Sequence, residues 1–192
     1  MYQQMNVISE KRAYRRSAED NILSRKDREV SDISGETLYI DGFNVMISLE
    51  IAYSNSMLFQ CMDGTIRDLA GLRGTYRLIP QTDSAITALL QTLEELQVQK
   101  AVIYLDKPVS NSGRLKKRIY ELAENIPFEL EVLIEDPVDA LLKTKPLIAS
   151  ADAIILDHCD RWFNLVKCVI EKRIGQYDYI DIIPYFSCIE SI

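Results

Sequence analysis

The chain has 192 residues, enough for one domain with a buried core, and its 47% hydrophobic and 27% charged residues exclude whole-chain disorder. Its apolar runs are much shorter than the roughly 20 residues that a membrane span needs, and the N-terminus lacks the apolar core of a secretory signal. The 22 basic and 29 acidic residues give a net charge of −7, which excludes a protein that coats nucleic acid through bulk positive charge.

Cysteine and histidine usage indicates the compartment. The four cysteines are widely spaced and form no C-x-x-C motif, and His158 is the sole histidine. This pattern argues against a zinc site and against a disulfide framework. We therefore expect a cytoplasmic protein that does not associate with a membrane.

The residues fall into two regions with different patterns. Residues 1–35 are polar and rich in helix formers, which predicts an N-terminal helical extension. From residue 36 to 192, short apolar runs alternate with amphipathic segments, which predicts a three-layer α/β/α, Rossmann-like domain with a mainly parallel sheet of about five strands. The strands are expected at residues 38–40, 101–105, 128–134, 153–156 and 179–183, and two of the helices at residues 84–97 and 113–125.

Acidic residues follow the first four predicted strands. Asp41 and Asp106 directly follow the first two, and Asp157 follows the fourth, with Asp160 three residues later. Ligands of open parallel sheets bind beyond the C-terminal ends of the strands, so these side chains are expected to converge. Clustered carboxylates without histidine or thiol partners favour Mg²⁺ or Mn²⁺, which activate water for phosphodiester cleavage. Asn44 is placed to hydrogen-bond a carboxylate or the substrate from the first turn of the following helix.

A simpler interpretation competes at some of these positions. Glu135 and Asp136 follow the third predicted strand, with Asp139 one turn further along the chain. A single acidic residue at a strand end is commonly a turn residue or a helix cap, and this explanation applies to Glu135 and Asp136 and equally to Asp160. It is weaker for the three acids that directly follow strands one, two and four, because independent caps need not converge.

Basic residues near the same edge would have to hold phosphate groups. Arg67, Arg73 and Arg77 lie in the long connection after the first strand, and glycines on either side of Arg73 let the backbone approach a ligand. Ser110 and Ser112 precede a helix whose free N–H groups favour an anion. The basic residues that begin this helix, 114–118, are more simply explained as a solvated helix face.

Several segments resemble the NYN and PIN-like nuclease superfamily. Residues 39–45 (YIDGFNV) resemble its opening D-G-x-N motif, and Asp106 is similar to its second acid. Asp139 is similar to the helical acid before the fourth strand, and residues 151–160 resemble the S-x-D-x-D-F segment that ends that strand.

The order of further segments is similar to that of an uncharacterised prokaryotic PIN-like family. That family has D-G-x-x-R-D, G-x-x-G-x-Y-R, L-D-x-P-x-S-x-S-G and I-L-D segments, the last before R-W-F, which correspond here to residues 63–68, 71–77, 105–113 and 155–163. The resemblance covers about residues 36–186. It implies a PIN-like, metal-dependent nuclease fold that acts on RNA or other single-stranded nucleic acid.

The resemblance and the strand-end acids together predict the site. Asp41, Asp106, Asp157 and Asp160 are expected to bind one or two Mg²⁺ or Mn²⁺ ions. Asp139 is expected to complete the set, and Asp63 or Asp68 to reach in from the long connection. A homodimer is compatible with this fold. Two alternatives stay open, a catalytically inactive module that binds nucleic acid or protein, and a metal-dependent phosphatase.

Overall fold

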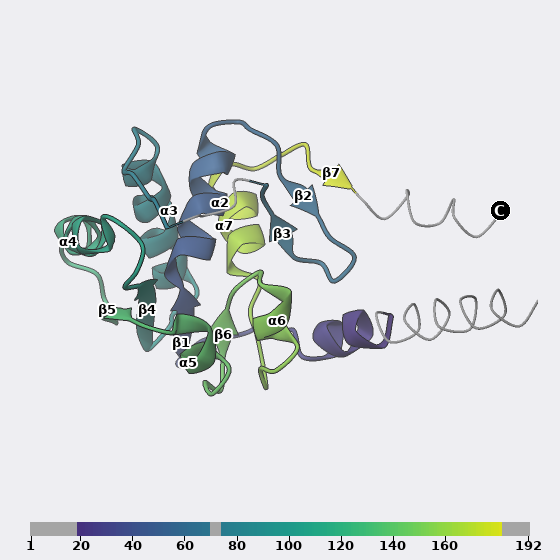
Figure 1. Ribbon diagram of the computed structural model, residues 1–192. Coiled ribbons are helices and arrows are strands. Elements are labelled where there is room, and N and C mark those ends of the chain that lie inside the picture. The colour runs from purple at the N-terminus through teal and green to yellow at the C-terminus, as the bar shows by residue number, and fades with distance from the viewer. Residues whose placement is uncertain (1–18, 70–73, 182–192) are drawn as a thin grey trace, which may run out of the picture.

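The computed structural model describes residues 19–69 and 74–181. Its main sheet has four parallel strands in the order β5-β4-β1-β6 (Figure 1). A smaller sheet has the order β3-β2-β7, in which β2 pairs antiparallel with β3 and parallel with β7. The strands are β1 (Thr37–Asp41), β2 (Phe59–Gln60), β3 (Ile66–Arg67), β4 (Lys100–Asp106), β5 (Glu129–Glu135), β6 (Ile148–Ala149) and β7 (Ile180–Asp181).

Helices connect the parallel strands, as a parallel sheet requires. Residues 19–27 are also helical and precede β1. None of the helices in the described part of the chain is long and apolar enough to cross a membrane. The helices after β1 are α2 (Gly42–Tyr53), α3 (Thr82–Glu95), α4 (Ser112–Leu122), α5 (Val138–Leu142), α6 (Ala153–Leu156) and α7 (Leu165–Arg173).

Alternate residues of the central strands belong to two separate buried clusters, as expected for strands covered on both faces. Leu38 and Ile40 of β1 pack in the larger cluster with side chains of α2, α3, α4 and α7. Val102 and Tyr104 of β4 pack in the smaller cluster with side chains of α5 and α6 and with the fully buried Trp162. Figure 1 shows α5 and α6 on the opposite side of the sheet from α2 and α7. The chain is therefore a mixed α/β structure built on a mainly parallel sheet.

The junction between β1 and α2 is unusually close to β4. A Cβ atom added to Gly42 would lie 2.6 Å from the Tyr104 carbonyl oxygen and 2.6 Å from Leu105 Cδ2. Both distances are shorter than a van der Waals contact of a carbon atom, so this position requires glycine, which has no Cβ. This contact lets α2 start directly after Asp41, the last residue of β1.

Most of the predicted elements are confirmed. The strands expected at residues 38–40, 101–105 and 128–134 correspond to β1, β4 and β5, and the two helices correspond to α3 and α4. The prediction of a strand at 153–156 is wrong, because these residues form α6 and the fourth strand of the sheet is β6. The strand expected at 179–183 is β7, which belongs to the smaller sheet; residues 182 and 183 lie outside the described residues.

The outer strand β5 is partly protected at its free edge. Within the described residues it pairs with β4 alone, so its other edge faces away from the sheet. The Tyr120 hydroxyl accepts a hydrogen bond from the Val132 backbone N–H at 2.9 Å. Glu129 and Glu131 carry charge along the strand and pair with Lys100 at 2.8 and 3.0 Å. One edge N–H group is thus already bonded, and the strand is charged.

The Gly42 contact can be tested by substitution. We expect Gly42→Ala to lower the free energy of unfolding by about 1–3 kcal/mol, because the added methyl group overlaps backbone that cannot move away. Gly113→Ala is the matched control: an added Cβ there meets nothing within 4 Å, and alanine favours helix. Urea unfolding of both variants measures the difference. Equal stabilities of the two variants would contradict the assignment.

Candidate metal centre

A cavity of about 490 Å³ opens beyond the C-terminal ends of β1 and β4. Its described lining includes Asn44 and one basic residue, Arg67. The cavity is strongly acidic, because five aspartates from five different parts of the chain line it: Asp41, Asp68, Asp106, Asp139 and Asp152.

Asp41 is buried at the centre of this group and is 7% exposed. Its Oδ2 accepts a hydrogen bond from the Ser150 hydroxyl at 2.8 Å. Asp41 is also the N-cap residue of α2. Burial, and to a lesser extent the nearby carboxylates of Asp106 and Asp139, raise its pKa to about 7, against the hydrogen bonds from the Ser150 hydroxyl and the Asn44 backbone N–H.

Asp106 and Asp139 bring two further carboxylates to the cavity. Asp106 ends β4, the neighbour of β1 in the sheet, and Asp139 lies in the first turn of α5. Burial raises the pKa of Asp106, and the negative charges of Asp139 and Asp136 add to that shift. Like-charge repulsion therefore acts on the two strand-end carboxylates, and a bound cation would relieve it.

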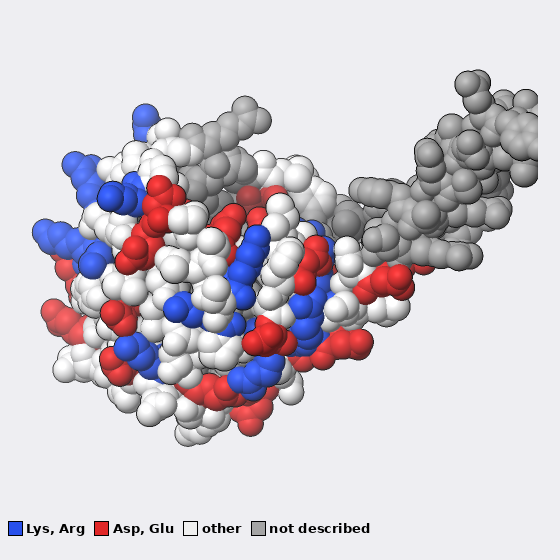
Figure 2. Space-filling view, turned by 60° about the horizontal axis from the view of Figure 1, so that its bottom comes forward, with Lys and Arg blue, Asp and Glu red and all other residues white. Residues whose placement is uncertain are grey.

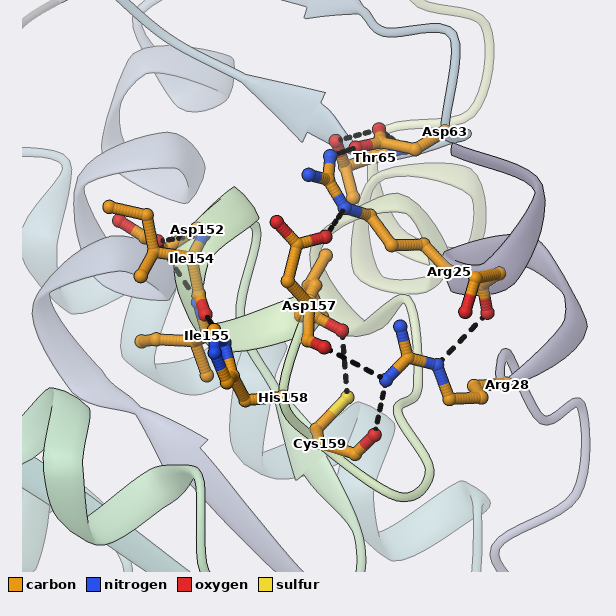
Figure 3. A network of polar contacts seen from close by, with 12 residues as sticks. Arg25, Arg28, Asp63, Thr65, Asp152, Ile154, Ile155, Asp157, His158 and Cys159 are labelled. Atoms are coloured by element: carbon orange, nitrogen blue, oxygen red, sulfur yellow. Dashed lines mark hydrogen bonds and ion pairs between the residues drawn. The ribbon is translucent and has the colours of Figure 1, made fainter. Parts of the chain in front are cut away.

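The segment after β6 holds the rim of the cavity in place. The Asn44 side-chain oxygen accepts a hydrogen bond from the Ala151 backbone N–H at 2.8 Å, which ties α2 to this segment. The Asp152 Oδ1 caps α6 by accepting from the N–H groups of Ile154 and Ile155 at 2.7 and 3.2 Å (Figure 3). Asp152 is thus both a helix cap and a residue of the cavity lining.

The β2–β3 hairpin brings Arg67 and Asp68 to the cavity. The Asp68 carboxylate accepts a hydrogen bond from the Ser48 hydroxyl of α2 at 2.9 Å. Arg67 Nε donates to the Ala151 carbonyl oxygen at 2.8 Å, and its Nη2 lies 2.7 Å from Asp63 Oδ2. Asp63 is 2% exposed and does not line the described cavity; its pairing with Arg67 connects it to the site.

The donor set fits a hard divalent cation. The carboxylate and amide oxygens of the lining, with no described histidine or thiol among them, suit Mg²⁺ or Mn²⁺. Among the described residues, however, no three Asp, Glu, His or Cys side chains lie close enough together to enclose an ion in this arrangement. Binding would therefore require the carboxylates of Asp41, Asp106 and Asp139 to move closer together.

Two predicted ligands lie elsewhere. Asp157 follows α6 rather than a strand, and its Oδ1 lies 2.6 Å from Arg25 Nε, as Figure 3 shows. Asp160 is exposed, and neither residue lines the described cavity. Asp160 also does not begin the next helix, whose N-cap is Asn164. The structure therefore does not bring Asp157 and Asp160 together with Asp41 and Asp106.

The other described residues among the predicted phosphate-binding groups lie apart from this cavity. Arg77 lines a second cavity of about 350 Å³ together with Arg114. Ser110 belongs to the same region, because its hydroxyl accepts a hydrogen bond from the Tyr76 backbone N–H at 3.2 Å. Ser112 is buried as the first residue of α4, and Arg73 lies outside the described residues.

The sequence did not identify three residues that lie in or near the site. Asp152 was not identified because the sequence predicts a strand at residues 153–156, and a strand has no helix cap. Its position before a short apolar run is a helix-cap signal that could have identified it. Ser150 could have been suspected only as a small polar residue after a strand. Arg25 lies far from the site in sequence, and no motif indicates its contact with Asp63.

The charges on the surface around this region are mixed. Figure 2 shows acidic and basic side chains interspersed over the visible described face rather than a broad area of one sign. A polyanion that approached this face would not find a large uniform positive field. Binding of such a polyanion would therefore depend on individual basic side chains such as Arg67.

The fold and the acidic cavity define a class of protein, a mixed α/β domain with carboxylates gathered at the C-terminal edge of its parallel sheet. The chain belongs to the family described as a domain of unknown function, DUF5616, whose model matches residues 30–168. It is 39% identical over 138 residues to the uncharacterized protein MJ0935 of Methanocaldococcus jannaschii. This match covers 72% of the chain and 66% of the archaeal protein. No solved structure matches the chain.

The raised pKa of Asp41 predicts a pH-dependent stability. The folded protein holds this proton up to about pH 7, whereas the unfolded chain releases it near 3.8. The contribution of Asp41 to the free energy of unfolding therefore falls as the pH rises from about 4 to 7. We expect Asp41→Asn, which keeps an acceptor for Ser150, to stabilise the protein by roughly 2 kcal/mol at pH 8 and by much less at pH 4.

Asp63→Asn provides the opposite control. Burial acts to raise the Asp63 pKa, but the hydrogen bond from Thr65 and the charges of Arg67 and Arg25 outweigh it and leave this pKa below its usual range. Its charge therefore stabilises the fold above about pH 4, and we expect Asp63→Asn to destabilise it there. Thermal unfolding from pH 4 to 8 measures both variants. A destabilised Asp41→Asn at pH 8 would contradict the prediction.

Proposed function

We propose that the protein is a metal-dependent nuclease that hydrolyses phosphodiester bonds in RNA. The observation that carries this proposal is the single cavity in which Asp41 and Asp106, at the ends of neighbouring strands, meet Asp139 and Arg67. The resemblance of residues 36–186 to PIN-like nucleases supports it, and a three-layer PIN-like arrangement is part of the proposal.

The residues divide into those that would hold a cation and those that would hold the substrate. Asp41, Asp106 and Asp139 would bind Mg²⁺ or Mn²⁺, and Asp68 and Asp152 lie in the same cavity to complete the oxygen set. When bound, the ion supplies an activated water molecule and positive charge to offset the negative charge that develops on the phosphate. These roles require the carboxylates to be ionised, so repulsion among them is expected before the ion binds.

The remaining polar groups position the reacting parts. The Asn44 side chain accepts a hydrogen bond from Ala151 in the rim, and the Ser150 hydroxyl donates to Asp41. The bond from Ser150 limits how far the Asp41 carboxylate can turn. Arg67 is the one basic residue in the described lining, and its side chain is 32% exposed. A guanidinium in this position would contact a non-bridging oxygen of the phosphate and offset its charge.

The metal assignment can be tested by calorimetric titration with Mn²⁺ in the presence of a single-stranded RNA oligonucleotide. We expect wild type to bind Mn²⁺ and Asp106→Asn to bind it at least about 10-fold more weakly. Binding by wild type should weaken below pH 7, because a proton competes for Asp41. Asp160→Asn is the matched control, since this exposed aspartate lies outside the described cavity.

Cleavage of an end-labelled RNA tests the reaction itself. Wild type with Mn²⁺ should yield shorter products, and Asp106→Asn should lose this activity while keeping its circular dichroism spectrum and melting temperature. Hydrolysis of a chromogenic phosphomonoester without cleavage of RNA would favour a phosphatase instead. RNA binding without Mn²⁺ binding or cleavage would favour a non-catalytic module.

A further inference from the structure

Arg25 is an exception on its helix. Its neighbours Ser24 and Lys26 are exposed, whereas Arg25 is 9% exposed and turns towards the body of the protein (Figure 3). Its Nη1 donates to Asp63 Oδ2 at 2.8 Å, and its Nε donates to Asp157 Oδ1 at 2.6 Å. One guanidinium therefore joins the helix at residues 19–27 to the β2–β3 hairpin and to the end of α6.

Asp63 lies between two guanidinium groups. Its Oδ2 accepts from both Arg25 and Arg67, at 2.8 and 2.7 Å. Its Oδ1 accepts from the hydroxyl and the backbone N–H of Thr65, at 2.6 and 3.2 Å. Because one carboxylate charge is shared by two arginines, Arg67 is less completely neutralised than it would be in an exclusive pair.

The Arg67 guanidinium has two partners, the Asp63 carboxylate and the Ala151 carbonyl oxygen. The same side chain also lines the acidic cavity. Any change that alters the charge or position of Asp63 therefore acts on the cationic group of the cavity. Arg25 is the group that contacts Asp63 from outside the hairpin.

We propose that Arg25 is a positioning residue for Arg67: by sharing Asp63, it keeps the Arg67 guanidinium directed into the cavity and leaves part of its charge free to attract an RNA phosphate. The phosphate part rests on the proposed function, whereas the positioning part does not. The helix at residues 19–27 is thereby a functional part of the site, although Arg25 precedes residue 30, where the family match begins.

Removing Arg25 leaves Asp63 paired with Arg67 as its one guanidinium partner, so more of the Arg67 charge is offset by Asp63. This change disfavours an anion beside Arg67. Asp157 also loses its ion pair with Arg25 at the end of α6. A purely structural role would instead weaken the docking of the helix and leave the surroundings of Arg67 unchanged.

Arg28 supplies a matched control for docking. Arg28 donates to backbone carbonyl oxygens: to that of Ser24 at 2.9 Å within its own segment, and to those of Cys159 at 2.6 Å and Asp157 at 3.4 Å across the contact. It therefore holds the same segment to the same region without contacting Asp63 in the bonds described. Arg28→Ala should reduce thermal stability and leave Arg67 as it is.

The first experiment uses no substrate. The ¹⁵N–¹H signal of Arg67 Nε, assigned with Arg67→Lys, should be protected from exchange in wild type because this group donates to Ala151. We expect Arg25→Ala to shift or broaden that signal, Arg25→Lys to change it less, and Arg28→Ala to leave it in place. An unchanged Arg67 signal in folded Arg25→Ala would overturn the proposal.

The second experiment measures the affinity for a single-stranded RNA oligonucleotide with Mn²⁺ at several salt concentrations, on variants also carrying Asp106→Asn to prevent cleavage. Arg25→Ala should weaken binding by about tenfold, as should Arg67→Ala, and each should lower the salt slope by about one. Adding Arg25→Ala to Arg67→Ala should have no further effect; additive losses would overturn the proposal. If the protein with Asp106 intact neither binds nor cleaves RNA while Arg25→Ala still alters the Arg67 signal, the positioning stands and the nuclease function fails.

Discussion

The first residue of α2 lies against the backbone of β4 at a distance that excludes any side chain. This contact allows the chain to pass from strand to helix without an intervening linker. Asp41 is therefore held at the end of β1 beside Asp106 of the adjacent strand, and Asn44 comes within reach of the segment after β6. The junction thus places Asp41 and Asn44, two of the polar groups that line the cavity.

Two buried aspartates show how surroundings decide whether a carboxylate charge stabilises the fold. Asp63 is surrounded by two guanidiniums and Thr65, so its charge stabilises the fold. Asp41 has a hydroxyl and a backbone N–H as partners and two carboxylates as neighbours, so its charge is costly. A buried carboxylate whose charge is costly is a candidate for a function outside folding, and a cation is a partner that would offset the cost.

The sequence predicted β1, β4, β5, α3 and α4 well, because long apolar runs and clear helical periodicity leave little ambiguity. It failed at residues 153–156, where four apolar residues fit a strand or a helix equally, and at β6, which is too short to show a pattern. Asp41, Asp106 and Asp139, expected together from strand ends and motif order, line one cavity, and their role as metal ligands stays a prediction. Asp157 does not line the described cavity; its position was inferred from the wrong element, and the contact of Arg25 with Asp63 depends on packing between distant segments.

The protected edge of β5 bears on how copies of this protein would meet. A strand from another molecule could extend the sheet there only by displacing the Tyr120 hydroxyl from the Val132 N–H and by lying alongside Glu129 and Glu131. Natural proteins use such charged, partly bonded edges against aggregation. Growth of the sheet from chain to chain is therefore disfavoured at this edge.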